Sequence, residues 1–189
     1  MSTSVYFFGG YEASQPDIDL WLRSAKQQKP NVAFFGFPWP ADTQSTPDDS
    51  VVKGAKKSGL YKSAVNAIQA CGADKIYIVG HSSGCAIANA VDNGLTDKSK
   101  IVLVSLDGFT PDPDQLKRSS TQVWGATCDG KTSRNYHGGL GSRLKVYPAT
   151  DCKTDWALHF SLVNTAATDK SVPTRQKGYF QCEANLMWL

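Results

Sequence analysis

Short, unbroken apolar segments alternate with segments of helical periodicity along most of this 189-residue chain, and this alternation constrains the fold more than any other feature. Strands that lack a polar face are typical of a parallel sheet covered on both sides. Right-handed crossover connections would place the intervening helices on the two faces. We therefore predict a three-layer α/β sandwich with a mainly parallel sheet of about six strands. The expected strands are residues 5–8, 32–35, 76–79, 101–104, 122–124 and 144–147.

The expected helices lie between these strands and complete one domain of ordinary size, residues 1–189. Ser14 and Pro16 mark the start of the first helix, as a cap residue followed by an early proline. Pro111 and Pro113 limit the connection from Asp107 to Ser120 to one short helix. Further helices are expected around residues 61–68, 85–91 and 157–167, and residues 171–189 are expected to form an irregular tail.

The charge balance argues against a nucleic-acid partner. The chain has 20 Lys and Arg against 17 Asp and Glu, a formal net charge of +3. Proteins that neutralise phosphates usually have a larger or more clustered basic excess. No C-x-x-C pair is present to suggest a zinc or redox motif, so we predict neither a metal nor a cofactor.

The five cysteines, at positions 71, 85, 128, 152 and 182, are odd in number and widely spaced. This pattern excludes a dense disulfide scaffold, and most of these thiols are expected to be buried as small apolar groups. Cys128 and Cys152 would pair if they were neighbours in space, which the sequence leaves open.

The first residues have neither a basic segment nor a long apolar one, and no apolar run is long enough to span a membrane. We therefore expect a cytoplasmic protein without a membrane span; its oligomeric state is open.

One motif indicates chemistry. Gly80-His-Ser82-Ser-Gly84 follows the apolar strand at 76–79 and precedes an alanine-rich helix. The pattern G-x-S-x-G is weak alone, but between a strand and a helix it predicts a nucleophile elbow that presents a serine hydroxyl. Ser82 is then the nucleophile, and the backbone N–H of Ser83 would face a developing oxyanion.

A serine hydroxyl is a poor nucleophile unless a base accepts its proton. The chain has three histidines. His81 lies inside the elbow and is expected to point away from Ser82. His137 precedes the last expected strand, whereas His159 follows it. The chain order serine, acid, histidine favours His159 as the base and leaves His137 as the alternative.

The acid that orients the histidine should follow a strand at the same edge of the sheet. Asp129 follows the fifth expected strand and is the preferred candidate, and Asp107, after the fourth strand, is the alternative. A second oxyanion donor is expected from the loop after the first strand, at the amide of Gly10 or Tyr11.

In these motifs and their order, the sequence resembles members of the α/β-hydrolase superfamily. The likeness is greatest to the small capless serine hydrolases of the retinoblastoma-binding-protein type. The shared features are Gly-His-Ser-Ser-Gly at 80–84, Gly-Ala-Thr-x-Asp at 125–129 and His159-Phe160, in this order along the chain. The resemblance implies an α/β-hydrolase-like fold and a triad of Ser82, Asp129 and His159. The short connection from Asp107 to Ser120 leaves no room for a cap domain, so the site should be open.

The expected function is that of a carboxylesterase-like serine hydrolase, which cleaves a small-molecule ester or thioester through an acyl-enzyme on Ser82. Amide or lactone hydrolysis remains open, because one fold serves many substrates. A different alternative is a binding protein that has kept the hydrolase fold with weak catalysis. Trp39 and Trp156 are candidates to line the substrate site, although both are equally compatible with ordinary packing.

Overall fold

The sheet has the strand order β2-β1-β3-β4-β5, with two further strands beside β5. The computed structural model describes residues 1–11, 13–40, 59–133, 140–165 and 183–189. Adjacent strands are parallel from β2 to β5, and β7 is parallel to β5. The prediction of a mainly parallel sheet is therefore confirmed. The strands are β1 (Thr3–Phe8), β2 (Val32–Phe37), β3 (Lys75–His81), β4 (Ile101–Leu106), β5 (Gln122–Cys128), β6 (Lys131–Thr132) and β7 (Leu144–Pro148).

The short strand β6 was not expected from the sequence. It runs antiparallel to the end of β5, and Cys128 lies opposite Lys131. Asp129 and Gly130 connect the two strands, and both have positive φ, 48° and 76°. Two consecutive residues of positive φ are what a type I′ hairpin turn requires, and Asp-Gly is a preferred sequence for it.

The helices begin where the sequence places its start signals. The side chain of Ser14 accepts a hydrogen bond from the backbone N–H of Asp17, and the Asp17 side chain accepts one from the Ser14 backbone, which closes a capping box. The last helix ends at Phe160 and is therefore shorter than expected. The helices are α1 (Gln15–Gln28), α3 (Gly59–Gln69), α4 (Gly84–Gly94), α5 (Pro113–Lys117) and α6 (Asp155–Phe160), with a 3₁₀ turn at Gly141–Arg143.

Alternate side chains of the strands supply two separate apolar cores, one on each face of the sheet. Val5 and Phe7 belong to the core beneath α1 and α6, whereas Tyr6 and Phe8 belong to the core beneath α3 and α4. Both faces of the central strands are buried, as their unbroken apolar sequences predict. The result is the expected three-layer arrangement.

The end of the chain joins the first of these cores. Trp188 is buried, and its ring centroid lies 6.5 Å from that of Trp21 and 5.9 Å from that of Tyr77. The Tyr77 hydroxyl donates a hydrogen bond to the carbonyl of Leu189 at 3.1 Å. The last residues, 183–189, are thus packed against the sheet, although 171–182 lie outside the described residues.

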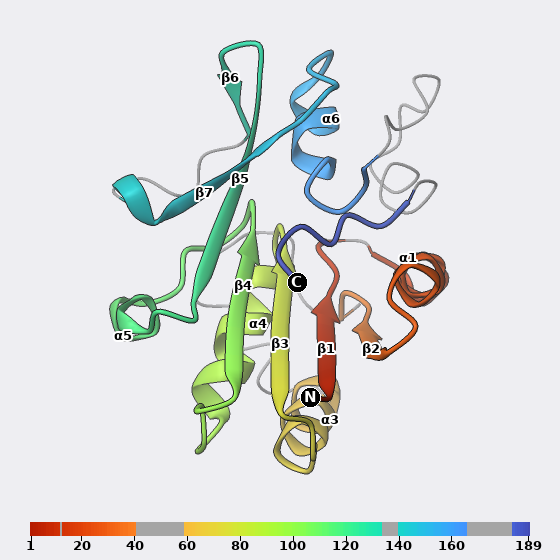
Figure 1. Cartoon of the computed structure of the whole chain (residues 1–189), viewed down its shortest axis with the longest axis vertical. Helices are drawn as coiled ribbons and strands as arrows, with labels where there is room; N and C mark the ends of the chain where they lie inside the picture. Colours follow the sequence, from red (N-terminus) through yellow and green to blue (C-terminus); the bar gives the residue numbers. More distant parts are fainter. Residues whose placement is uncertain (12, 41–58, 134–139, 166–182) are drawn as a thin grey trace.

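Two features bear on access to the carboxyl edge of the sheet. The connection between β4 and β5 contains only the five-residue helix α5, so no cap domain is inserted there. Figure 1 shows α6 beyond the carboxyl ends of β1, β3 and β4. Among the described residues, no helix is both long and apolar enough to cross a membrane.

Candidate active site

Ser82 lies in the sharp turn between β3 and α4, in a backbone conformation that side chains rarely adopt. Its φ is 54°, and its backbone N–H donates a 3.0 Å hydrogen bond to the carbonyl of Leu106 at the end of β4. A Cβ on Gly80 would lie 2.5 Å from the Cα of Cys85, so only glycine allows the helix to start so close to the strand. These are the properties of a nucleophile elbow.

The loop after β1 lies directly against the elbow. A Cβ on Gly84 would lie 2.3 Å from the carbonyl oxygen of Phe8, which shows how closely the start of α4 approaches this loop. Within the described part of the chain, no hydrogen bond is donated by the backbone N–H of Gly10, Tyr11 or Ser83. With no acceptor among the described residues, these N–H groups beside the strained serine are suitably placed to receive an oxyanion.

His159 and Asp107 form a buried pair at this edge of the sheet. The Nδ1 of His159 lies 2.5 Å from Oδ2 of Asp107, and the two side chains are 2% and 0% exposed. Because a carboxylate only accepts hydrogen bonds, Nδ1 carries the proton and donates it. The other ring nitrogen, Nε2, is then the basic one in the neutral imidazole.

Asp107 directly follows β4, and its own backbone is strained. Its φ is 45°, and its N–H donates a 2.9 Å hydrogen bond to the carbonyl of Trp124. A Cβ on the next residue, Gly108, would lie 2.1 Å from the carbonyl oxygen of Ser82. The segment that carries Asp107 is therefore in direct contact with the elbow.

His159 is held in place by His81, the residue that precedes Ser82. The Nε2 of His81 donates to the backbone carbonyl of His159 at 3.2 Å, and the two ring centroids are 4.4 Å apart. Burial lowers the pKa of His81 well below its usual 6.5, and the nearby imidazole of His159 lowers it further. His81 is thus a neutral, buried side chain, as expected of a packing residue, and it also links the elbow to α6.

Ser82 and His159 lie at the same edge, but Ser82 Oγ forms no hydrogen bond with His159 among the described residues. Catalytic hydrogen bonds of a free enzyme are often long and shorten when substrate binds. The absence of a hydrogen bond between Ser82 and His159 is therefore compatible with catalysis. The alternative base considered from the sequence, His137, lies outside the described residues.

The structure corrects the assignment of Asp129 as the partner of His159. Trp124 of β5 lies opposite Leu106, the last residue of β4, so Asp107 is level with the next residue of β5, Gly125. Asp129 comes four residues after Gly125, about 13 Å farther along an extended strand. It is exposed in the hairpin turn between β5 and β6. The sequence shows that Asp107 and Asp129 each follow a strand, but the two strands end at different levels. Because β5 continues well past the end of β4, Asp129 lies beyond the level of Asp107.

A disulfide joins Cys128, at the end of β5, to Cys152, in the segment between β7 and α6. Their Cα atoms are 5.6 Å apart, and the bond ties the segment leading to His159 to the sheet. The two sulfur atoms and the Asp129 carboxylate lie within 4.8 Å of one another, the one group of potential metal ligands in the described ranges. Disulfide sulfurs are not thiolates, the form in which cysteine binds metals.

The two tryptophans proposed to line the site differ in exposure. Trp39 follows β2 and is 7% exposed, with Tyr11 against its edge at 6.0 Å between ring centroids. It is therefore mainly a packing residue, although its indole N–H has no partner among the described residues. Trp156 is half-buried, and its ring meets that of His159 edge-on at 5.7 Å.

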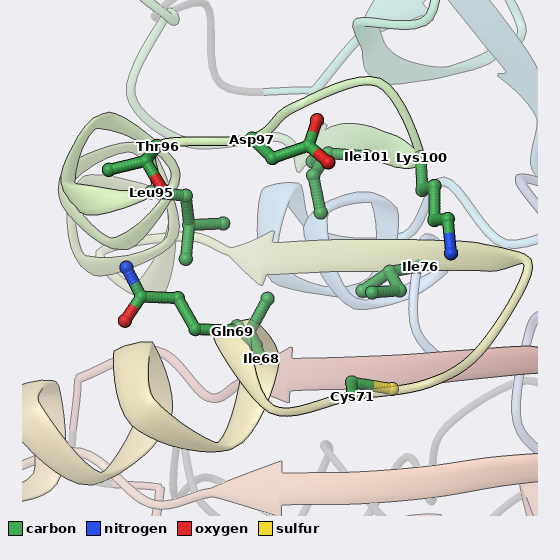
Figure 2. A pocket seen from close by; sticks show the side chains of 9 residues that line it. All are labelled: Ile68, Gln69, Cys71, Ile76, Leu95, Thr96, Asp97, Lys100 and Ile101. Atoms are coloured by element: carbon green, nitrogen blue, oxygen red, sulfur yellow. The ribbon is translucent and has the colours of Figure 1, made fainter.

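A cavity of about 410 Å³ lies at the opposite edge of the sheet, near the amino ends of β3 and β4. Figure 2 shows its walls, in which apolar side chains such as Ile76 and Ile101 face polar ones such as Lys100. None of its lining residues belongs to the cluster of Ser82, Asp107 and His159.

Known proteins resemble this chain in fold, not in sequence. No protein-family model and no curated protein matches it. An uncharacterized protein from Bacillus cereus matches 78% of the chain at 14% identity, with a TM-score of 0.51. The chain spans about half, 53%, of that protein. Esterase PE8 matches 77% of the chain and 82% of its own length at 15% identity and a TM-score of 0.48. A Xanthomonas campestris protein assigned to the α/β superfamily of hydrolases matches 76% of the chain and 85% of its own length at 14% identity, with a TM-score of 0.48.

The strand order and the elbow after β3 decide the fold class. The chain has an α/β-hydrolase-like fold. At these identities the likeness concerns the fold alone, and one fold serves many activities. Function must therefore be argued from the site.

Proposed function

We propose that this α/β-hydrolase-like protein is a serine hydrolase that cleaves a carboxylic ester through an acyl-enzyme on Ser82. Asp107 replaces Asp129 in the triad considered from the sequence. The observation that carries the proposal is the buried bond from His159 Nδ1 to Asp107, formed beside a serine with a φ of 54°. A buried imidazole–carboxylate pair next to a strained serine supplies the base and the nucleophile of acyl transfer.

In the first half of the reaction, Nε2 of His159 accepts the proton of the Ser82 hydroxyl as Oγ attacks the ester carbonyl carbon. The carbonyl oxygen becomes an oxyanion, which the N–H groups of Ser83 and of Gly10 or Tyr11 would receive. Collapse of the tetrahedral intermediate breaks the bond to the alcohol oxygen. His159 then returns its proton to the departing alcohol, and Ser82 remains acylated.

In the second half, water replaces the alcohol. His159 accepts a proton from water as the water oxygen attacks the acyl carbon, and the second tetrahedral intermediate expels Ser82 Oγ. The proton passes from His159 back to Ser82, which releases a carboxylic acid and restores the enzyme. Asp107 remains ionised throughout and stabilises the imidazolium that forms in each half.

The direct test is the hydrolysis of p-nitrophenyl acetate and butyrate by the purified protein. Ser82→Ala and His159→Ala are expected to abolish turnover above the uncatalysed rate while the circular dichroism spectrum is unchanged. Ser2→Ala, a serine far from the sheet edge that carries Ser82, is the matched control and should retain full turnover. Unchanged hydrolysis by Ser82→Ala would refute the proposal.

The substrate is proposed only at the level of a small ester. A panel containing a thioester, an anilide and a lactone separates esterase from thioesterase, amidase and lactonase activity. A binding protein with weak catalysis, the alternative from another class, would show no Ser82-dependent turnover across the panel. Half-buried Trp156 is the better candidate for a substrate contact, because Trp39 is almost fully covered.

The expected cytoplasmic location stays a prediction, and one observation weighs against it. Disulfides such as Cys128–Cys152 persist mainly in oxidising compartments.

A further inference from the structure

Asp107 has a second buried hydrogen-bond partner besides His159. The hydroxyl of Ser133, which follows β6, lies 2.9 Å from Oδ1 of Asp107, whereas His159 binds Oδ2. Ser133 is 5% exposed. The two carboxylate oxygens are thus each fixed by a different side chain, one from the β5–β6 hairpin and one from α6.

The directions of these hydrogen bonds follow from the chemistry of the groups. The backbone N–H of Ala126 donates to Ser133 Oγ at 2.8 Å, so this oxygen acts as an acceptor. The Asp107 carboxylate can only accept, and the Ser133 hydroxyl proton must therefore point to Oδ1. Ser133 thus accepts a hydrogen bond from the Ala126 N–H and donates one to the Asp107 carboxylate. Consecutive hydrogen bonds of this kind polarise one another, and each becomes stronger.

The hairpin delivers Ser133 to this position. The tight turn at Asp129 and Gly130 sends the chain back along β5, and the N–H of Ser133 donates to the carbonyl of Ala126 at 2.7 Å. Ser133 and Ala126 are thus joined by two hydrogen bonds. The carbonyl of Trp124, also in β5, accepts the hydrogen bond from the Asp107 N–H. Ser133 and Asp107 are therefore both held by hydrogen bonds to the same strand.

We propose that Ser133 is a positioning residue of the hydrolase, which acts on catalysis by fixing the Asp107 carboxylate toward His159. This inference rests on the proposed function. Without the hydroxyl, Asp107 loses a donor to Oδ1, and the orientation of its carboxylate toward the imidazole is less tightly fixed. The effect falls on the chemical step, because the hydrogen bonds of Ser133 within the described ranges go to Ala126 and Asp107 and not to the elbow or the loop after β1.

The test combines steady-state kinetics with a double-mutant comparison on p-nitrophenyl acetate. Ser133→Ala is expected to lower kcat about 10- to 100-fold with KM changed less than about threefold, the effect of losing a hydrogen bond to a charged group. In an Asp107→Ala background, the same substitution is expected to change kcat less than about threefold, because its target is gone. Thr132→Ala removes a neighbouring hydroxyl from an exposed position of β6 and should leave kcat unchanged.

A full additional loss in the Asp107→Ala background would overturn the proposal, as would a kcat within about threefold of the parent for Ser133→Ala. Ser133→Thr retains the hydroxyl and should recover most of the lost kcat; equal loss in both variants contradicts the role of the hydroxyl. If Ser133→Ala fails to melt cooperatively, Ser133→Cys keeps the size with a much weaker donor and should show the same loss.

A second readout separates this inference from the proposed function. The His159 Nδ1 proton, held by Asp107, is observable by proton NMR as a strongly downfield resonance in the resting protein. Ser133→Ala should shift or remove it, and Ser133→Thr and Thr132→Ala should retain it, whether or not the protein turns over esters. A resonance that is the same in Ser133→Ala as in the parent refutes the positioning role. Absent turnover with a Ser133-sensitive resonance refutes only the hydrolase.

Discussion

Replacing Asp107 or Asp129 by asparagine distinguishes the carboxylate that binds His159 in the structure from the one favoured by chain order. Asp107→Asn preserves size and removes the charge that faces His159. The Ser133 hydroxyl donates toward Oδ1 and so favours the amide oxygen there, which turns the amide nitrogen of the substituted side chain toward His159 Nδ1. The imidazole must then accept at Nδ1 and protonate at Nε2, the nitrogen required as the base.

The magnitude follows from burial. Asp107 and His159 are 0% and 2% exposed, so solvent cannot replace the lost carboxylate when the imidazolium forms. Removing one partner of a buried charge pair costs about 3 to 5 kcal/mol, equivalent to a roughly 200- to 5,000-fold lower kcat. Asp129 is exposed and about 13 Å beyond the level of Asp107 in the direction of β5, so Asp129→Asn should change kcat less than about threefold.

The assay is steady-state hydrolysis of p-nitrophenyl acetate by both variants, with thermal melts to show that each is folded. A large loss for Asp107→Asn beside near-parental activity of Asp129→Asn is the expected result. The reverse order of the two losses would refute the assignment of Asp107.

Three further predictions concern stability and reactivity. Because the folded-state pKa of His81 is depressed, its contribution to stability is present above about pH 6.5 and is lost as the pH falls, since only the unfolded chain takes up the proton. Urea titrations measure the free energy of unfolding of the parent and of His81→Asn between about pH 6 and 5. In this range the free energy of the parent should fall more steeply than that of the variant, by about 1.4 kcal/mol per pH unit. Equal slopes would contradict the neutral, buried state of His81. The disulfide closes a loop with a sequence separation of 24, so Cys128→Ser with Cys152→Ser should lower the free energy of unfolding by about 3 kcal/mol; no change in denaturant midpoint argues that the bond is absent. Burial raises the pKa of Cys85 to about 12, whereas the pKa of half-buried Cys71 is lowered, because its hydrogen bonds outweigh the effect of burial. Iodoacetamide at about pH 8 should therefore label Cys71 and not Cys85 in the native protein, and peptide mapping that finds Cys85 labelled first would contradict this.

The layers of the fold could be predicted because local sequence and burial agree. Strands β3 and β4 contain the unbroken apolar runs 76–79 and 101–104, and both strands are buried on both faces. The elbow was also predictable, because Gly80 is required where β3 meets the start of α4, and Gly84 is required where α4 meets the loop after β1. Such close approaches are encoded by the residues themselves.

The acid could not be predicted from chain order, because it depends on the register of β5 against β4. Sequence shows where a strand ends but not how far it extends past its neighbour, and β5 passes β4 by several residues. A signal for the correct assignment was present. Asp129-Gly130 is a preferred hairpin turn, and recognising it would have assigned Asp129 to the turn and left Asp107 as the partner of His159. Ser133 was missed because its role depends on that hairpin.

The central claim, that Ser82 is a nucleophile activated by His159, is tested most directly by mass mapping of the protein after reaction with a fluorophosphonate. We expect one phosphonyl adduct, on the peptide that contains Ser82, formed much more slowly in His159→Ala and absent in Ser82→Ala. An adduct on another residue, or none on Ser82 at reagent concentrations that fully label a known serine esterase, would contradict it.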